Sequence, residues 1–245
     1  MLIRFAEVYE NTEVLSPIDR ETWQIIGETC RIGPDSRVIE LASGKGAFAQ
    51  YLAKRFGCKV DCYDINLEFV DYSLGQTKEL GLAARVRASC RDVNSLNVDS
   101  EAYDLGVCLG ALYIFREAGF RVLKRAVKPQ GNLAVSDMYC KKLPPPKEVR
   151  DIFFEEEEGR VLTLDEARKW YTDKGLEVIG EEECSRKAWL EYYDLTRKML
   201  SVLARKYKDD KDRKAEIEEA LKEDEAVRRY GEEYLGYMTF IMKKR

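Results

Sequence analysis

The fold of this 245-residue chain is decided by one stretch near its N-terminus, Arg37-Val38-Ile39-Glu40-Leu41-Ala42-Ser43-Gly44-Lys45-Gly46. Its first five residues form a compact run typical of a buried strand, and residues 47–56 continue with a helical pattern. Small residues join the two, and glycine at 44 and 46 permits a sharp turn and close approach of a ligand to the backbone. The stretch therefore predicts a strand, a tight turn and a helix, an arrangement shared by nicotinamide, flavin and other nucleotide binders.

The rest of the chain continues this alternation of strands and helices. Further strands are expected at residues 58–64, 85–89, 103–109, 132–137, 175–180 and 237–242, and further helices at 67–80, 117–127 and 163–174. Thr163 and Glu166 have the spacing of a capping box at the start of the last of these helices. Alternating strands and helices predict a parallel sheet that binds ligands at the carboxyl ends of its strands.

Two segments interrupt that regular pattern. Three consecutive prolines at 144–146 form a stiff connector after the fifth strand. A long helical pattern from Trp189 to about Tyr234, rich in charged residues, separates the last two strands. We interpret it as a helical insertion.

The composition excludes several kinds of chemistry. The chain has no histidine, so nucleophile pairs with histidine and imidazole-bound zinc sites are excluded, and we expect no metal. Its 41 basic residues nearly balance 45 acidic ones, which gives no broad positive field for nucleic acid or anionic lipid. The seven cysteines are scattered without a CxxC pair and are expected to be reduced thiols. No apolar run is long enough for a signal peptide or a membrane span, so we expect a cytoplasmic protein.

Acidic residues at strand ends indicate which nucleotide binds. Asp64 follows Gly46 by 18 residues and ends the second strand, where it is placed to accept hydrogen bonds from an adenosine ribose. Glu40 lies beside the glycine turn, where its carboxylate opposes a diphosphate and favours a ligand that carries ammonium and sulfonium groups. The pattern favours S-adenosylmethionine. The alternative is that the glycines only permit a tight connection and that Asp64 caps the next helix.

A third acid follows the third strand. Asp92 is placed to accept a hydrogen bond from an adenine amino group, and Val93 offers an adjacent backbone donor. The alternative for Asp92 is an Asx turn or a helix cap.

These residues together resemble a known family. The stretch from Val38 to Gly46 is similar to motif I of the class I S-adenosylmethionine-dependent methyltransferases. Further matches follow in order at Asp64, Arg91-Asp92-Val93, residues 103–107 and residues 123–133. The resemblance covers residues 32–140 and implies an α/β, Rossmann-like sheet of seven strands in the order 3-2-1-4-5-7-6, with strand seven antiparallel and helices on both faces. Ala42 and Gln130 stand where the family usually has glycine, and we expect them to alter loop shape more than ligand identity.

A narrower resemblance concerns small-molecule methyltransferases that carry a helical cap. It rests on residues 110–113, 134–139 and 236–238. With it we expect an N-terminal helical lid at 1–31, a cofactor-binding core at 32–186, a cap insertion at 187–235 and a final core strand at 236–245.

The resemblance also implies a set of site residues. The expected cofactor contacts come from Glu40, Gly44, Gly46, Asp64, Ile65, Asp92, Val93 and Leu109. The expected substrate contacts come from Tyr9, Tyr113, Tyr139, Trp189 and Tyr193, whose rings can shape a pocket or attract a cationic group. Core packing is the alternative for these aromatic residues. Asp137, at the end of the fifth strand, is the candidate for orienting the acceptor or accepting a proton, with a turn cap as its alternative.

We therefore expect an enzyme that moves a methyl group from S-adenosylmethionine to a small-molecule nucleophile by in-line displacement. Three alternatives stay open: an RNA or protein methyltransferase, a nicotinamide-dependent oxidoreductase, and a non-catalytic relative that binds the cofactor as a signal. Near-neutral net charge argues against nucleic acid as a partner. The residues leave the identity of the acceptor and the oligomeric state open.

Overall fold

The computed structural model describes residues 5–112, 116–153 and 161–245. The strands are β1 (Arg37–Leu41), β2 (Lys59–Asp64), β3 (Val86–Cys90), β4 (Tyr103–Leu109), β5 (Val127–Cys140), β6 (Leu162–Thr163), β7 (Leu176–Glu183) and β8 (Leu235–Lys244). The α-helices are α1 (Phe5–Val8), α2 (Arg20–Thr29), α3 (Ala47–Phe56), α4 (Leu67–Glu79), α5 (Arg116–Ala126), α6 (Lys147–Phe153), α7 (Leu164–Asp173), α8 (Arg186–Lys206) and α9 (Lys211–Tyr234), and a short 3₁₀ helix, η1, covers Val93–Ser95.

The strands form one sheet in the order β3-β2-β1-β4-β5-β8-β7. Strand β8 runs antiparallel to both of its neighbours, whereas the pairs on the β3 side of β5 are parallel. The expected seven-strand order is therefore confirmed. The structure adds β6, a two-residue strand that pairs with the end of β5. Two residues are too few to show a strand pattern in the sequence.

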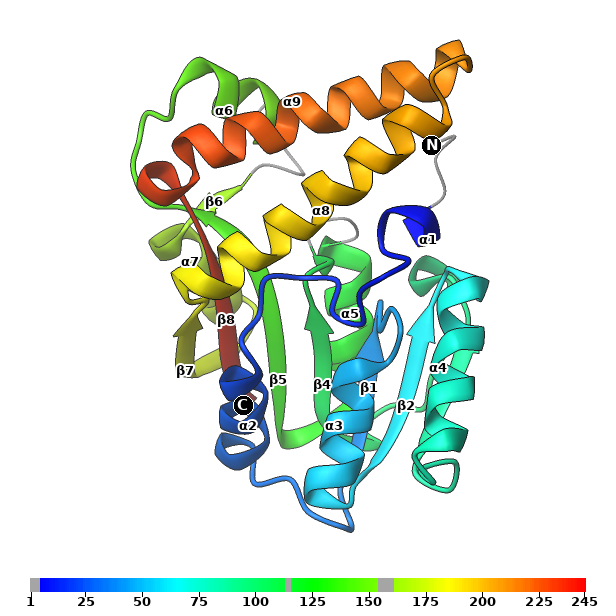
Figure 1. The fold of residues 1–245 in the computed structure, drawn as a ribbon. Helices are drawn as coiled ribbons and strands as arrows, with labels where there is room; N and C mark the ends of the chain where they lie inside the picture. Colours follow the sequence, from blue (N-terminus) through cyan, green and yellow to red (C-terminus); the bar gives the residue numbers. More distant parts are fainter. Residues whose placement is uncertain (1–4, 113–115, 154–160) are drawn as a thin grey trace.

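Helices cover both faces of the sheet (Figure 1). Side chains alternate along each strand, so neighbouring residues of β1 belong to different cores. Val38 packs with α2 and α3 in the first core, and Ile39 packs with α5 in the second. Because both faces are buried, the strands read as nearly continuous apolar runs.

The termini of several helices follow from capping residues. The capping box predicted for Thr163 and Glu166 is present at the start of α7. Helix α4 is capped by Asn66, whose side chain accepts from the backbone N–H groups of Glu68 and Phe69. Ser185 caps α8 in the same way through the N–H of Ala188. All seven cysteines are free thiols, as expected, and five of them are buried.

The helical insertion lies across the carboxyl ends of the parallel strands (Figure 1). It is a pair of helices, α8 and α9, that pack against each other, with α6 packed against α9. The sequence pattern predicts continuous helix here, whereas the structure has a break between the two helices at residues 207–210. There Asp210 caps α9 by accepting from the backbone N–H of Arg213.

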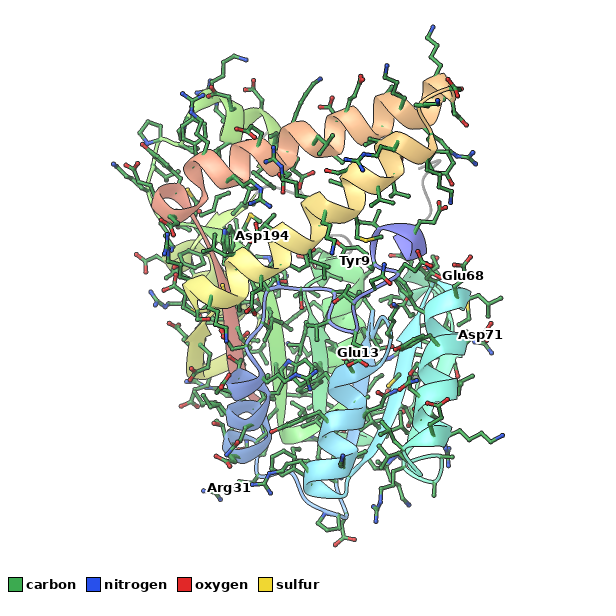
Figure 2. The ribbon with its side chains drawn as sticks, in the orientation of Figure 1. Tyr9, Glu13, Arg31, Glu68, Asp71 and Asp194 are labelled. Carbon is green, nitrogen blue, oxygen red and sulfur yellow. The ribbon has the colours of Figure 1, made fainter. Side chains whose placement is uncertain are left out.

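The N-terminal segment runs between this cap and the edge of the sheet. Figure 2 shows Tyr9 and Glu13 on that segment. The Lys45 ammonium, from the glycine turn, donates to the backbone carbonyls of Tyr9 at 2.8 Å and Glu10 at 2.9 Å. The segment is therefore fastened directly to the turn. None of the helices in the described part of the chain has the length and apolar character needed to cross a membrane.

Candidate active site

The glycine turn adopts a backbone conformation that few residues tolerate. Ala42, Gly44 and Gly46 have φ angles of 50°, 54° and 74°. Gln130, the other residue that replaces a family glycine, has a φ of 62°. Both departures from the motif therefore retain the left-handed conformation that glycine adopts most easily.

Asp64 connects this turn to the next strand. Because β1 and β2 are parallel neighbours, their carboxyl ends meet at one edge. The Asp64 carboxylate accepts from the backbone N–H of Gly44 at 2.7 Å and from that of Asn66 at 2.8 Å. Asn66, and not Asp64, caps the following helix.

The Asp64 side chain retains the capacity to bind a ligand. It is 7% exposed, and burial raises the pKa of its carboxyl group. Each carboxylate oxygen has more than one acceptor position, so the two backbone contacts leave room for donors from a ligand. The predicted ribose contact is chemically possible at this position.

The expected adenine contacts lie near this edge. Ile65 is 71% exposed although its side chain is large and apolar. Asp92 accepts from the backbone N–H of Asn94 at 2.9 Å and caps η1, and Val93 is buried. The cap interpretation of Asp92 is thus present, and its contact with adenine stays a prediction.

Glu40 lies in the interior beside the turn. It is only 4% exposed, and its carboxylate lies 3.8 Å from the thiol of Cys62, which donates to it. Burial raises the pKa of Glu40 to about 8. Glu40 and Leu109 border a cavity of about 40 Å³, together with Trp23 and Leu15.

Trp23 borders this cavity and carries an unpaired donor. Its indole N–H is buried and has no hydrogen-bond partner among the described residues. A buried donor without a partner costs free energy, and a carboxylate in the cavity would satisfy it. An adjacent ammonium would meet the Glu40 carboxylate. One unpaired donor and one carboxylate at the same cavity are the chemical complement of an amino-acid group such as the methionine part of S-adenosylmethionine. Trp23 was not predicted from the sequence.

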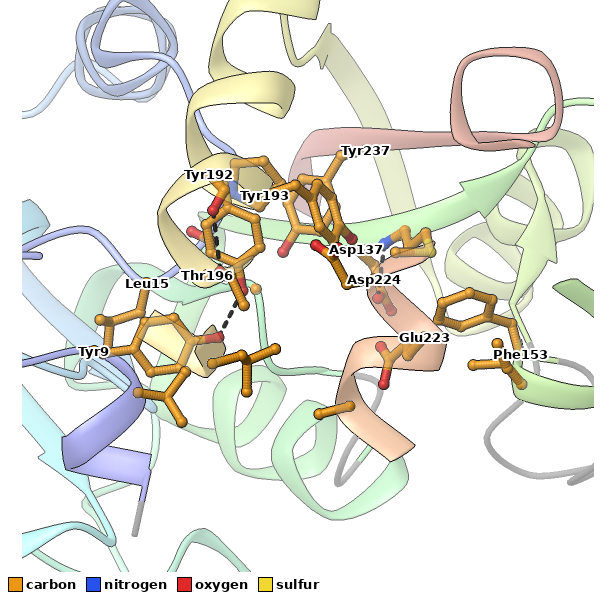
Figure 3. A pocket seen from close by; sticks show the side chains of 18 of the residues that line it. Tyr9, Leu15, Asp137, Phe153, Tyr192, Tyr193, Thr196, Glu223, Asp224 and Tyr237 are labelled. Carbon is orange, nitrogen blue, oxygen red and sulfur yellow. Dashed lines mark hydrogen bonds between the residues drawn. The ribbon is translucent and has the colours of Figure 1, made fainter. Parts of the chain in front are cut away.

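A larger cavity of about 460 Å³ lies between the cap and the sheet (Figure 3). The hydroxyls of Tyr9 and Tyr192 are 2.8 Å apart and connect the N-terminal segment to α8. Leu15 and Ser16 border both cavities. The consecutive residues Leu109 and Gly110 border the smaller and the larger cavity respectively. The two spaces therefore lie next to each other at the end of β4.

The structure brings two predicted substrate residues, Tyr9 and Tyr193, and the predicted catalytic residue Asp137 to the larger cavity. The Asp137 carboxylate accepts from the backbone N–H of Met138 at 2.9 Å. Tyr113 lies outside the described residues. Tyr192 also lines the cavity and was missed, although it directly precedes Tyr193 in the sequence.

Two predicted substrate residues lie elsewhere among the described residues. Tyr139 donates to the Glu183 carboxylate at 2.7 Å and packs over Gly236, away from the cavity lining. Trp189 packs its ring 4.9 Å from that of Tyr193, so the two do share a helix face, but Trp189 belongs to the core.

Comparisons with known proteins identify the domain that carries the glycine turn. Residues 38–131 match the family model described as a methyltransferase domain. The protein YjhP of Escherichia coli (strain K12) is 25% identical over 181 residues, which cover 72% of each chain. A glycine/sarcosine/dimethylglycine N-methyltransferase of Actinopolyspora halophila is 26% identical over 130 residues, 51% of this chain and 22% of that protein.

Solved structures share the whole fold. A methyltransferase from Geobacter sulfurreducens, crystallised with S-adenosyl-L-homocysteine, superimposes with a TM-score of 0.85 at 23% identity, covering 98% of this chain and 97% of that one. The strand order, the motif residues and the matched domain point to one family and one cofactor, S-adenosylmethionine. Residues 38–131 therefore form a methyltransferase domain with the class I, S-adenosylmethionine-dependent fold.

Proposed function

We propose that this enzyme methylates a small molecule held in the larger cavity. The observation that carries the proposal is the shared border of the two cavities at Leu15 and Ser16. A volume of about 460 Å³ lies within the usual range for small-molecule sites. The N-methyltransferase of Actinopolyspora halophila is named for the amino acids glycine, sarcosine and dimethylglycine, which supports a small-molecule acceptor without fixing its chemical class.

The cofactor would be held by residues at the carboxyl ends of β1, β2 and β3. Glu40 would face the ammonium group, Trp23 the carboxylate and Asp64 the ribose hydroxyls. Ile65 would pack against the adenine ring, whose amino group would meet Asp92. S-adenosylmethionine supplies a methyl group already activated on a sulfonium centre.

The remaining tasks belong to the chain itself. The N-terminal segment, fastened by Lys45, covers the glycine turn and excludes water from it. Tyr9 and Tyr192 close the adjacent side of the larger cavity. Asp137 orients the acceptor and takes its proton when the nucleophile carries one.

A transfer assay tests the acceptor class. The protein is incubated with methyl-labelled S-adenosylmethionine and, separately, with small-molecule, RNA and protein fractions of a cell extract. We expect label in a small-molecule product only. Asp137→Asn should lower that transfer by about 100-fold, the usual contribution of a positioned acid or base, without weakening S-adenosylhomocysteine binding. Label in RNA or protein instead would replace the proposal with one of the macromolecular alternatives.

Trp23→Phe tests the inferred carboxylate contact. The Trp23 ring packs against those of Phe48 and Tyr51, with ring centroids 5.6 and 5.5 Å apart. Phenylalanine retains an aromatic ring at this position but removes the indole N–H. A hydrogen bond to a charged group contributes about 1.5–3 kcal/mol, so we expect S-adenosylhomocysteine to bind at least about tenfold more weakly. Trp170→Phe, on the opposite face of the sheet, is the matched control. Equal binding by both variants would show that Trp23 only packs.

A further inference from the structure

The larger cavity has an unusual distribution of charge. Four carboxylate side chains line it, those of Asp137, Glu216, Glu223 and Asp224, and no lysine or arginine does so among the residues that the structure describes. Asp137 comes from β5 and the other three from the cap helix α9, and Figure 3 labels Asp137, Glu223 and Asp224. A negative lining of this kind favours a positively charged ligand.

Asp224 supplies an acceptor that the protein leaves without a donor. The residue is 3% exposed, and its Oδ2 atom accepts from Arg197 at 3.0 Å and from Arg228 at 2.9 Å. Its Oδ1 atom is buried and has no hydrogen-bond partner in the described part of the chain. Neither arginine lines the cavity. A hydrogen-bond donor on a ligand in the cavity would give the Oδ1 atom of Asp224 the partner that it lacks.

Glu223 is accessible at the cavity and forms no ion pair with any residue that the structure describes. Desolvation by the surrounding protein raises the pKa of its carboxyl group, and the negative charges of Asp224 and Glu219 raise it further. A cation beside Glu223 would relieve this repulsion.

Aromatic rings complete the lining. Tyr9, Tyr192, Tyr193 and Tyr237 border the same space (Figure 3). The negative face of a tyrosine ring attracts an ammonium group that lies within about 6 Å of the ring centre. Carboxylates and tyrosine rings that line one cavity are complementary to an organic cation.

We propose that the methyl acceptor is an amine that enters the larger cavity as a cation and carries no carboxylate of its own. The inference rests on the proposed function and narrows its substrate class. An amino-acid acceptor would place its carboxylate in the same cavity as the Glu223 carboxylate and the unpaired Oδ1 atom of Asp224.

Methyl transfer to such a cation requires the loss of one proton. An ammonium nitrogen has no lone pair, so one of its protons first passes to the Asp137 carboxylate and from there to water. The freed lone pair forms the new carbon–nitrogen bond while the carbon–sulfur bond of the donor breaks, and its electron pair stays on sulfur. The positive charge thereby moves from sulfur to the methylated nitrogen.

A pair of probes that differ only in charge tests the proposal by binding. Choline carries a quaternary ammonium, and 3,3-dimethylbutan-1-ol has the same shape without charge. Each is titrated by calorimetry into the protein saturated with S-adenosylhomocysteine. We expect choline to bind at least about tenfold more tightly than the neutral alcohol, and Glu223→Gln to remove most of that difference. Glu218→Gln, on the same helix outside the cavity lining, is the control.

The outcomes separate the two proposals. If S-adenosylhomocysteine itself fails to bind, the proposed function is wrong. If it binds but choline binds no better than the alcohol, or not at all, the function stands and the cationic acceptor is overturned. Tighter binding of butyrate than of choline also overturns it. An unchanged preference in Glu223→Gln would contradict the assignment to this cavity.

Discussion

Asp64→Ala weakens the binding of S-adenosylmethionine and S-adenosylhomocysteine by roughly 100-fold, as calorimetric titration will measure. Two effects combine. The variant loses the charged acceptor for the ribose hydroxyls, and it leaves the backbone N–H of Gly44 without the 2.7 Å contact that holds the turn. Hydrogen bonds to a charged group contribute about 1.5–3 kcal/mol each, so the loss of two reaches this size.

Two further variants separate binding from folding. Asp64→Asn keeps one acceptor oxygen for the backbone and removes the charge, so it should bind with intermediate affinity. Asp71→Ala, an exposed residue of α4 labelled in Figure 2, should bind as the unchanged protein does. Thermal unfolding shows whether each variant is folded. A folded Asp64→Ala protein with unchanged affinity would remove Asp64 from the cofactor site.

The sequence predicts the fold around the glycine turn well because the signals there are local. The strand, turn and helix around Gly44 are consecutive, and Asp64 is placed by one βαβ unit. The same holds for the cap of α7 at Thr163, where the two interacting residues are three positions apart. Contacts between near neighbours are encoded in residue type and spacing.

The positions of the predicted substrate residues depend on contacts between segments that are distant in the sequence. The apolar run predicts that the fifth strand ends at residue 137, which would leave Tyr139 in a loop near the cavity. Pairing with β8 instead extends β5 to Cys140. Tyr139 therefore lies on the sheet opposite Gly236 and reaches Glu183 on β7. Strand length here is set by a partner almost 100 residues away in the sequence.

The cap shows the same limit of local reasoning. The spacing of Trp189 and Tyr193 correctly predicts that they share a face of α8. Which neighbouring residue borders the cavity depends on how α8 is rotated against the N-terminal segment. The contact between Tyr192 and Tyr9, 183 residues apart, fixes that rotation. Glu223 is likewise placed by the packing of α9 on α8.

Cofactor binding at pH 7 should release close to one proton, and Glu40 is its source. Burial raises the pKa of Glu40 from 4.5 to about 8, so most of the free protein holds this proton at pH 7. An ammonium group beside Glu40 favours the ionised carboxylate and lowers its pKa. Affinity should therefore rise with pH by up to about tenfold per unit while the pH stays below about 7.5, where an α-amino group keeps its charge.

The variant Glu40→Gln shows whether the proton released on cofactor binding comes from Glu40 or from another group. Calorimetry in two buffers with different ionisation enthalpies measures the protons released, and the variant should release almost none. The variant also tests stability. Because the folded pKa is raised, Glu40 favours the folded state below pH 4.5, and that contribution is lost as pH rises through about 8. The free energy of unfolding should therefore fall over this range in the unchanged protein relative to Glu40→Gln. Equal proton release together with equal cofactor affinity in both proteins would mean that Glu40 lies away from the ammonium group, and the charge-based choice of a sulfonium donor over a dinucleotide would lose its physical basis.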